Sequence, residues 1–232
     1  NQYIYKDNAY TLPRHGFARE RNFMVDDHTT DGIVFLLTHD SSTQAVYPFS
    51  FQLRIIYSLN NSTLKVQYEV TNTGADAMLF SLGAHPAFRV PLTETTAYSD
   101  YDLTFSHKEQ APIWPINNEG LLKNTPIEFL SNTQSLPLTK ELFYQDALVF
   151  KNLKSNQISL RSAKHGHGLD FHFDHFPFFG IWAAKNADFV CLEPWCGVAD
   201  SEYHNSQLEN KEGIQNLNPK QTWVRSWHVR TY

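Results

Sequence analysis

Two ionisable side chains, His85 and Glu193, each end an alternating apolar segment and stand directly before a proline. In the segment 78–85 the even positions are all apolar, whereas the odd positions become small and polar toward His85. Because side chains alternate between the two faces of a strand, one face is expected to pack a core and the other to present His85. The segment 189–193 repeats this pattern, with Glu193 on the face opposite to the apolar even positions. An imidazole and a carboxylate at two strand ends are typical of a general acid and a general base.

The prolines and small residues beside His85 and Glu193 indicate where these side chains lie on their strands and whether a ligand can reach them. Proline confines the preceding residue to extended backbone, so Pro86 and Pro194 are expected to fix His85 and Glu193 at strand ends. Small residues before His85 would let a ligand approach, as in the floor of a groove. The residue types alone leave a structural role open, because a single His or Glu beside a proline is more commonly structural or exposed.

Strand patterns that could position these residues run through most of the sequence. The clearest is 64–71, where apolar and polar residues alternate strictly between the turn residues of 60–61 and 72–74. This run predicts an antiparallel meander with 49–59 and 77–84. A hairpin is expected at the start, with strands at 3–5 and 10–12. Further strands are expected at 33–38, 101–105, 148–152, 157–161, 169–173, 178–183, 189–193 and 222–230.

This number of strands requires stacked sheets, so the predicted fold class is all-β, a large antiparallel β-sandwich. The one helical candidate is 139–144, and the proline-containing intervals at 86–91, 112–115 and 126–137 are expected to be connections. The 232 residues, of which 41% are hydrophobic and 14% aromatic, can bury one substantial core. We therefore expect a single domain over residues 1–232.

The charge and apolar patterns exclude several classes of partner. A formal net charge of -5 and a pI near 6.1, without a basic cluster, argue against nucleic acid. No apolar run approaches the ~20 residues that span a bilayer, so no membrane partner is expected. Residues 1–20 lack the zones of a signal peptide. Only Cys191 and Cys196 occur, close together around Pro194, so no disulfide framework is expected and a reducing cytoplasmic location fits.

Four short segments occur in order along the chain and carry a resemblance to a known family. They are His15-Gly16-Phe17-Ala18-Arg19, Gly83-Ala84-His85-Pro86-Ala87-Phe88, Asp146-Ala147-Leu148, and 192–200, which reads Leu-Glu-Pro-Trp-Cys-Gly-Val-Ala-Asp. Together they resemble the aldose 1-epimerase, or galactose mutarotase, superfamily, and its LacX-like branch in particular. The resemblance runs from residue 1 to the C-terminus and implies a galactose mutarotase-like supersandwich.

The resemblance also implies roles for individual residues. Glu193 would take the proton from the anomeric hydroxyl of an aldose, and His85 would protonate the ring oxygen. His15 would contact the sugar ring, and Asp146 would bind sugar hydroxyls. Arg19 lies in a segment that helps to hold the phosphate in hexose-6-phosphate epimerases. Independently of the resemblance, Trp195 and Trp182 are candidates for an aromatic surface against the C–H face of a sugar, and core packing is the equal alternative for each.

Mutarotation moves only protons, so no cofactor and no metal are expected, and the expected partner is a small sugar. Family members carry a preceding N-terminal part with strands and an arginine that reaches the substrate. This chain opens at Asn1 inside the expected hairpin, so that part is expected either to be missing from it or to have its residues elsewhere in the sequence.

A second constellation is the histidine-rich segment 165–175, which contains four histidines and two aspartates. These are ligand types for zinc or copper, but no closed tetrahedral spacing is evident, and a solvated edge strand with a glycine-rich turn is the favoured interpretation. Cys191 is expected to lie in a sheet rather than act as a nucleophile, since it has no basic neighbour in sequence.

Several functions stay open at this point. The favoured one is epimerisation of a free aldose, followed by the same chemistry on a hexose 6-phosphate and by a non-catalytic carbohydrate-binding sandwich. A glycoside hydrolase that uses Glu193 and Asp146 is a more distant alternative, which the separation of the two carboxyl groups would test. The identity of the sugar and the oligomeric state are not readable from the sequence.

Overall fold

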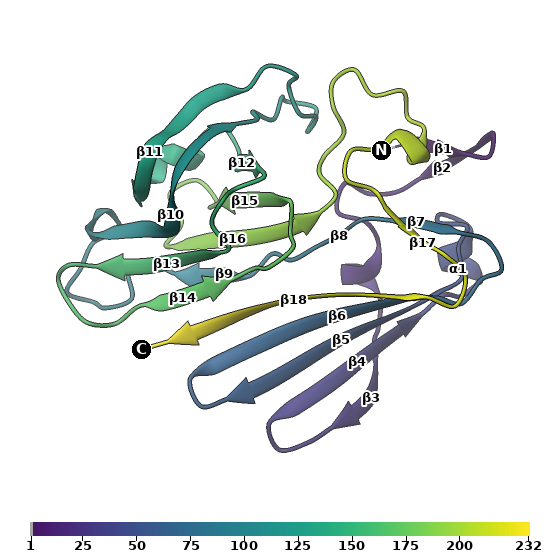
Figure 1. Cartoon of the computed structure of the whole chain (residues 1–232), viewed down its shortest axis with the longest axis horizontal. Helices are drawn as coiled ribbons and strands as arrows, with labels where there is room; N and C mark the ends of the chain where they lie inside the picture. The colour runs from purple at the N-terminus through teal and green to yellow at the C-terminus, as the bar shows by residue number, and fades with distance from the viewer. Residues whose placement is uncertain (1) are drawn as a thin grey trace. The chain divides into compact units, whose positions relative to one another are not determined.

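The computed structural model describes residues 2–232, and strands dominate them (Figure 1). The chain divides into two compact units, Asn1–Ser81 with Tyr203–Ser226, and Leu82–Glu202 with Trp227–Tyr232. The all-β fold class is confirmed, whereas a single domain stays a prediction. In residues 2–232 no helix has the length and apolar character that crossing a bilayer requires.

The first unit is built on the predicted meander. Strands β3, β4, β5 and β6 pair in sequence order as antiparallel neighbours, and the start of β18 continues this sheet beside β6. The hairpin of β1 and β2 and the pair β7–β17 complete the unit. The bounds are β1 Gln2–Tyr5, β2 Asn8–Thr11, β3 Met24–His28, β4 Gly32–Thr38, β5 Phe51–Asn60, β6 Thr63–Asn72, β7 Met78–Phe80, β17 Gln215–Leu217 and β18 Thr222–Thr231.

The short helices are mostly single turns. The α-helix α1 spans Ser41–Gln44, and Asp40 caps its N-terminus by accepting a hydrogen bond from the Thr43 N–H. The 3₁₀ turns are η1 Ala18–Glu20, η2 Tyr98–Asp100, η3 Lys140–Phe143 and η4 Leu208–Asn210. The predicted helix at 139–144 is therefore the shorter 3₁₀ turn η3.

An aromatic cluster in the first unit holds the segment 15–19. The Phe17 ring lies 5.8 Å from the rings of both Tyr47 and Phe51, measured between centroids. The Tyr47 hydroxyl donates a 2.7 Å hydrogen bond to the Leu79 carbonyl, and burial raises the pKa of Tyr47 well above its usual value. Phe17 thereby anchors the loop that carries His15 and Arg19.

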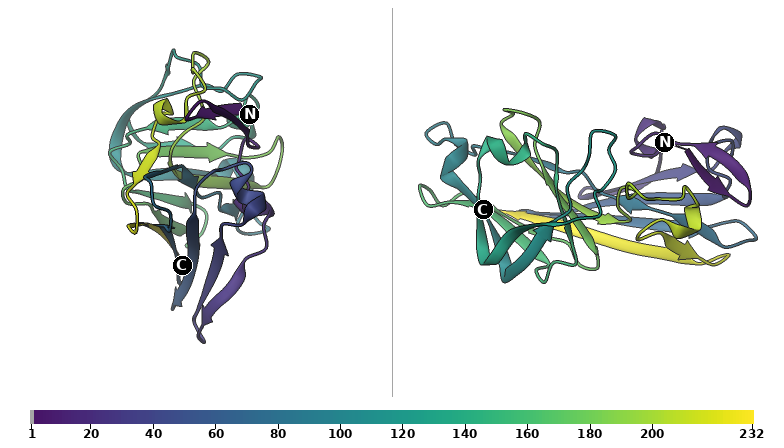
Figure 2. Two further views of the ribbon diagram at one scale, coloured as in Figure 1. Left: turned by 90° about the vertical axis from the view of Figure 1, so that its right-hand side faces the viewer. Right: turned by 90° about the horizontal axis from the view of Figure 1, so that it is seen from above.

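The second unit contains two facing antiparallel sheets (Figure 2). One has the order β11-β10-β13-β14, continued by the end of β18. The other has the order β12-β15-β16, and both β8 and β9 pair with the free side of β16. The bounds are β8 Leu82–Gly83, β9 Ala87–Arg89, β10 Tyr101–Ile113, β11 Ile127–Pro137, β12 Leu148–Lys151, β13 Gln157–Ser162, β14 Leu169–His172, β15 Phe178–Trp182 and β16 Phe189–Cys196.

Aromatic side chains fill the space between these two sheets. Phe171 of β14 is fully buried and lies 6.3 Å from Phe179 of β15, and Phe105 of β10 lies 6.5 Å from Phe150 of β12. Each such side chain contributes roughly 1.5–3 kcal/mol through burial. The even positions of β16 point into this core, so its odd positions, Glu193 among them, lie on the opposite face.

Some predicted strand boundaries are wrong. The segment 78–85 was predicted to be one strand, but it divides into β7 and β8, because β7 pairs with β17 and β8 pairs with β16. The interval 126–137 was predicted to be a connection and contains β11, while 86–91 contains β9. Strand β3, exposed along its whole length, was missed because it lacks an apolar period.

One buried carboxylate joins three strands of the second unit. Asp170 of β14 accepts hydrogen bonds from Ser159 (2.6 Å), Arg161 (3.1 Å) and Arg230 (2.7 Å). Burial by itself raises the pKa of Asp170, but these hydrogen bonds and the charge of Arg161 outweigh it and lower the pKa to about 2. The folded state therefore holds Asp170 as an anion.

This network makes the free energy of unfolding depend on pH. The folded pKa of about 2 lies below the unfolded value of 3.8, so the Asp170 contribution is complete above pH 3.8 and is lost as the pH falls toward 2. Because both arginines are more than half exposed, we expect a contribution on the order of 1–2 kcal/mol. Urea unfolding from pH 7 to pH 2 should show the stability gap between wild type and Asp170→Asn narrowing below pH 4. A gap that stays constant would contradict this.

Candidate functional site

Strand register places His85 directly opposite Glu193. Gly83 pairs with Trp195 on one side of this position, and Ala87 pairs with Cys191 on the other, in the same antiparallel register. The chain between β8 and β9 therefore continues alongside β16. Side chains that face each other across an antiparallel pair lie on the same face of the sheet.

The two prolines change the hydrogen bonding around this position. The Ala84 N–H donates to the Pro194 carbonyl at 3.0 Å, and the Leu192 N–H donates to the Pro86 carbonyl at 3.2 Å. Neither bond has its reciprocal partner, because proline has no N–H to donate. His85 and Glu193 lie between these two bonds as a pair without mutual backbone bonds, the arrangement in which side chains approach most closely.

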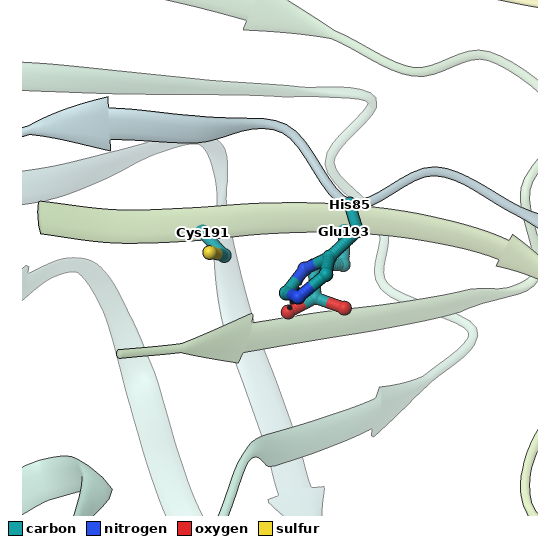
Figure 3. Close-up of side chains that lie close together, drawn as sticks. All are labelled: His85, Cys191 and Glu193. Carbon is teal, nitrogen blue, oxygen red and sulfur yellow. Dashed lines mark ion pairs between the residues drawn. The ribbon is translucent and has the colours of Figure 1, made fainter. Parts of the chain in front are cut away.

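The side chains of this pair are in direct contact (Figure 3). His85 Nδ1 lies 2.9 Å from Glu193 Oε1, where the imidazole N–H can donate to the carboxylate. The His85 side chain is 52% exposed, whereas that of Glu193 is only 9% exposed. A half-exposed ring thus lies beside a buried carboxylate.

Two glycines make room for an indole ring beside Glu193. Gly180 lies opposite Glu193 on β15, and Gly83 lies opposite Trp195 on β8. A Cβ added at either glycine would lie 2.4 Å from an atom of the Trp195 ring, closer than Cβ atoms approach other groups. The ring therefore lies across both glycine positions, on the face that carries Glu193.

Two more side chains border the pair. The Trp182 ring lies 5.6 Å from the His85 ring, measured between centroids. Cys191 lies two residues before Glu193 on the same face and is buried. Burial, together with the nearby charge of Glu193, raises the pKa of the Cys191 thiol to about 12. Cys191 is therefore a protonated thiol at neutral pH and a poor nucleophile.

Asp146 lies in a bend two residues before β12, and in the sheet β15 separates β12 from β16, the strand of Glu193. Its φ angle is +134°, a conformation that side-chain-bearing residues rarely adopt, and its carboxylate accepts a 2.7 Å hydrogen bond from the Ala147 N–H. Backbone strain of this kind costs on the order of 1–3 kcal/mol and is concentrated at functional sites. The substrate-binding role of Asp146 stays a prediction.

His15 and Arg19 belong to the first unit. His15 lies in an exposed turn, and Arg19 lies in η1, held by the Phe17 anchor. Their contact with a sugar stays a prediction.

The histidine-rich segment 165–175 uses several of its polar groups within the second unit. His172 stacks on His228 of the neighbouring strand with ring centroids 4.2 Å apart. The carboxylate of Asp174 accepts a 2.7 Å hydrogen bond from the Asn156 side chain.

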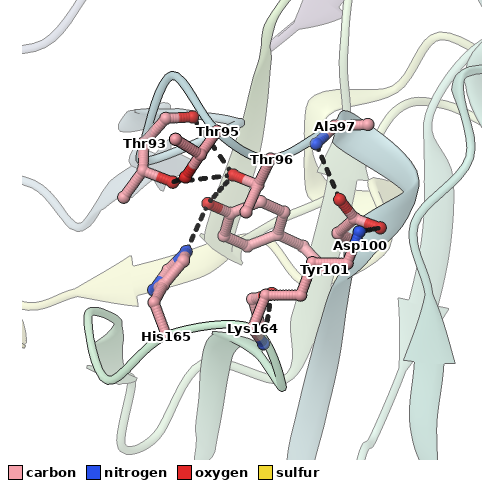
Figure 4. Close-up of polar contacts among 9 residues, drawn as sticks. Thr93, Thr95, Thr96, Ala97, Asp100, Tyr101, Lys164 and His165 are labelled. Atoms are coloured by element: carbon pink, nitrogen blue, oxygen red, sulfur yellow. Dashed lines mark hydrogen bonds and ion pairs between the residues drawn. The ribbon is translucent and has the colours of Figure 1, made fainter.

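His165 is part of a hydrogen-bonded network around Tyr101 (Figure 4). His165 Nδ1 accepts from the His167 N–H at 3.1 Å, so a neutral ring carries its proton on Nε2 and donates to the Tyr101 hydroxyl at 2.8 Å. That hydroxyl also accepts from the Leu92 N–H at 2.7 Å. Both ring nitrogens of His165 thus stabilise local structure.

The arrangement around Glu193 is suited to moving protons between adjacent atoms. A buried carboxylate can accept a proton, and an imidazole in contact with it can deliver one nearby. The alternation of residues predicted which face each side chain occupies. It gave no signal for Gly180 or Gly83 as partners of Trp195, because strand register is needed to relate them.

Comparisons with known proteins agree with this fold. The family model described as Aldose 1-epimerase matches residues 1–226. Protein LacX (chromosomal) of Lactococcus lactis subsp. lactis is 36% identical over 224 residues, which cover 94% of this chain and 74% of LacX.

Two solved structures share the fold. A galactose mutarotase related enzyme from Lactobacillus acidophilus has a TM-score of 0.94 and 31% identity, over 100% of this chain and 78% of that one. A galactose mutarotase-like protein from Lactobacillus casei has a TM-score of 0.91 and 27% identity, over 100% of this chain and 80% of that one. The chain belongs to the aldose 1-epimerase family.

Proposed function

We propose that this chain interconverts the α and β anomers of an aldose, with Glu193 as general base and His85 as general acid. The observation that carries the proposal is the 2.9 Å contact between a half-exposed imidazole and a buried carboxylate on one sheet face. Membership of the aldose 1-epimerase family supports it.

The reaction requires two proton transfers at neighbouring oxygens. The Glu193 carboxylate takes the proton of the anomeric hydroxyl while His85 gives a proton to the ring oxygen, and the bond between C1 and the ring oxygen breaks. The resulting aldehyde turns about its bond to C2, and closure from the other face returns both protons. Because the two oxygens are bonded to the same carbon, the acid and the base must lie side by side, as these residues do.

Other residues are proposed to bind the sugar. The Trp195 ring offers an apolar surface beside Glu193, of the kind that packs against sugar C–H groups. Asp146 is proposed to bind sugar hydroxyls and His15 to contact the sugar ring, and Arg19 is proposed as a further substrate-binding residue. A free aldose is the proposed substrate, ahead of a hexose 6-phosphate, because the chain is acidic and only Arg19 is a candidate phosphate ligand. The proposed location is the cytoplasm.

Replacing either member of the pair should reduce turnover more than binding. Glu193→Gln keeps the shape of the side chain but cannot accept the anomeric proton, and His85→Asn cannot deliver one. We expect kcat to fall by about 10²–10⁴, or roughly 3–5 kcal/mol of transition-state stabilisation, with sugar affinity largely kept. Polarimetric rates and calorimetric binding, measured on the same preparations, check this.

The outcomes of that experiment separate the alternatives. Unchanged turnover with weakened binding would mean that the pair only holds the sugar, as in a carbohydrate-binding protein. Circular dichroism and melting temperatures identify variants that merely unfold. This control is needed because His85→Asn removes the imidazole that contacts the buried Glu193 carboxylate.

The position of the Trp195 ring can be tested through Gly180. In Gly180→Ala the new Cβ would meet the indole at 2.4 Å and displace it, so we expect weaker sugar binding and a loss of about 1–3 kcal/mol of stability. Gly166→Ala is the matched control, since nothing lies within 4 Å of its added Cβ. Equal sugar affinity in both variants would remove Trp195 from the proposed site.

A further inference from the structure

Three side chains with different metal-ligating groups lie close together, and two of them are His85 and Glu193. An imidazole nitrogen of His85, the sulfur of Cys191 and a carboxylate oxygen of Glu193 all lie within 4.8 Å of one another. Figure 3 shows the three side chains on the same side of the sheet. Among residues 2–232, no other three His, Cys, Asp or Glu side chains bring their ligand atoms this close together.

The separation is close to that of a tetrahedral metal site. With zinc-to-nitrogen and zinc-to-sulfur bonds of about 2.0–2.3 Å, tetrahedral ligand atoms lie about 3.5 Å apart. A separation of 4.8 Å would therefore have to shorten by about 1.3 Å at most. The half-exposed His85 ring can supply this movement by rotation, while Cys191 and Glu193 are held in β16.

The donor set selects the type of metal. One sulfur, one nitrogen and one oxygen suit a borderline or soft divalent cation such as Zn²⁺ or Cd²⁺ and not Mg²⁺ or Ca²⁺, which take oxygen ligands. A neutral imidazole, a thiolate and a carboxylate balance the two positive charges, so the complex itself is neutral, which suits a site where Cys191 and Glu193 are buried. Burial raises the pKa of the thiol, so only a metal with high affinity for thiolate can displace its proton.

We propose that His85, Cys191 and Glu193 bind one thiophilic divalent cation and that the bound cation inhibits the enzyme. On binding, the metal–sulfur bond forms as the S–H bond breaks, and the proton passes to solvent. The cation is then coordinated by the lone pairs that Glu193 and His85 need for proton transfer. The inhibition rests on the proposed epimerase function, whereas the binding does not.

Cadmium titration of the whole chain tests the binding, because a cadmium–thiolate bond gives an ultraviolet charge-transfer band that histidine and carboxylate ligands do not. We expect a band that saturates at one Cd²⁺ per chain. It should be absent in Cys191→Ala and unchanged in Cys196→Ala, a matched control in which an equally buried thiol is removed from the core side of the same strand. His85→Ala should weaken Cd²⁺ binding at least about tenfold.

No band in the wild type, or a band that survives in Cys191→Ala, overturns the metal site. If Cys191→Ala does not fold, judged by circular dichroism, Cys191→Ser replaces it. If the band is lost in Cys191→Ala but Cd²⁺ binds equally well to the wild type, His85→Ala and Glu193→Gln, the thiol alone binds cadmium. That result also overturns the three-ligand site.

Inhibition is measured separately by polarimetry. Zn²⁺ should slow anomer interconversion by the wild type at least about tenfold at the concentration that fills the site, and a chelator should restore the rate. Cys191→Ala should lose this sensitivity relative to its own metal-free rate. If the band depends on Cys191 but Zn²⁺ does not slow the reaction, the metal site is supported. The proposal that the bound cation inhibits the reaction is then overturned. A band in a protein without epimerase activity supports the metal site while the proposed function fails.

Discussion

The strand register that places His85 opposite Glu193 is the constraint on which the candidate site depends. Two side chains separated by more than one hundred residues must lie opposite each other in neighbouring strands and at the same face. The register of β8 and β9 against β16 achieves this. Pro86 and Pro194 leave each flanking backbone pair with one hydrogen bond in place of two. The pair thus lies where the ladder is weakest and the side chains are closest.

The two faces of strand β16 lie in different surroundings. Its even positions enter the core between the two sheets of the second unit, where Val190 and Leu192 are fully buried. Its odd positions carry Cys191, Glu193 and Trp195 on the other face. Because the core fixes the even positions, the odd positions cannot shift without turning apolar side chains outward, which specifies the register strongly. The packing that stabilises the sandwich therefore also positions the carboxylate.

Local patterns predicted most of the fold, because alternation and turn residues determine strands. The hairpin of β5 and β6 and the two-faced character of β16 followed directly from the sequence. The break between β7 and β8 could not be predicted, since it arises from a change of pairing partner while the apolar period continues. Strand β11 was missed because its segment lacks a clear alternation and ends in proline.

The candidate site was predictable in part. The face of each side chain followed from alternation, and the resemblance to a family related His85 to Glu193. Their contact could not be derived from spacing, because it depends on the pairing of strands far apart in the sequence. The proximity of Cys191 to both residues depends on the same pairing. The positions of His15 and Arg19 on a loop of the first unit rest on aromatic packing around Phe17, which no local pattern indicates.

The proposed role of this pair in anomer interconversion can be tested in solution. The most direct measurement is the change in optical rotation of freshly dissolved α-glucose and α-galactose with the wild-type chain present. We expect at least one sugar to reach its unchanged equilibrium rotation faster, at a rate proportional to protein concentration. Rates equal to the spontaneous ones for both sugars, with protein that is folded and binds them, would contradict it.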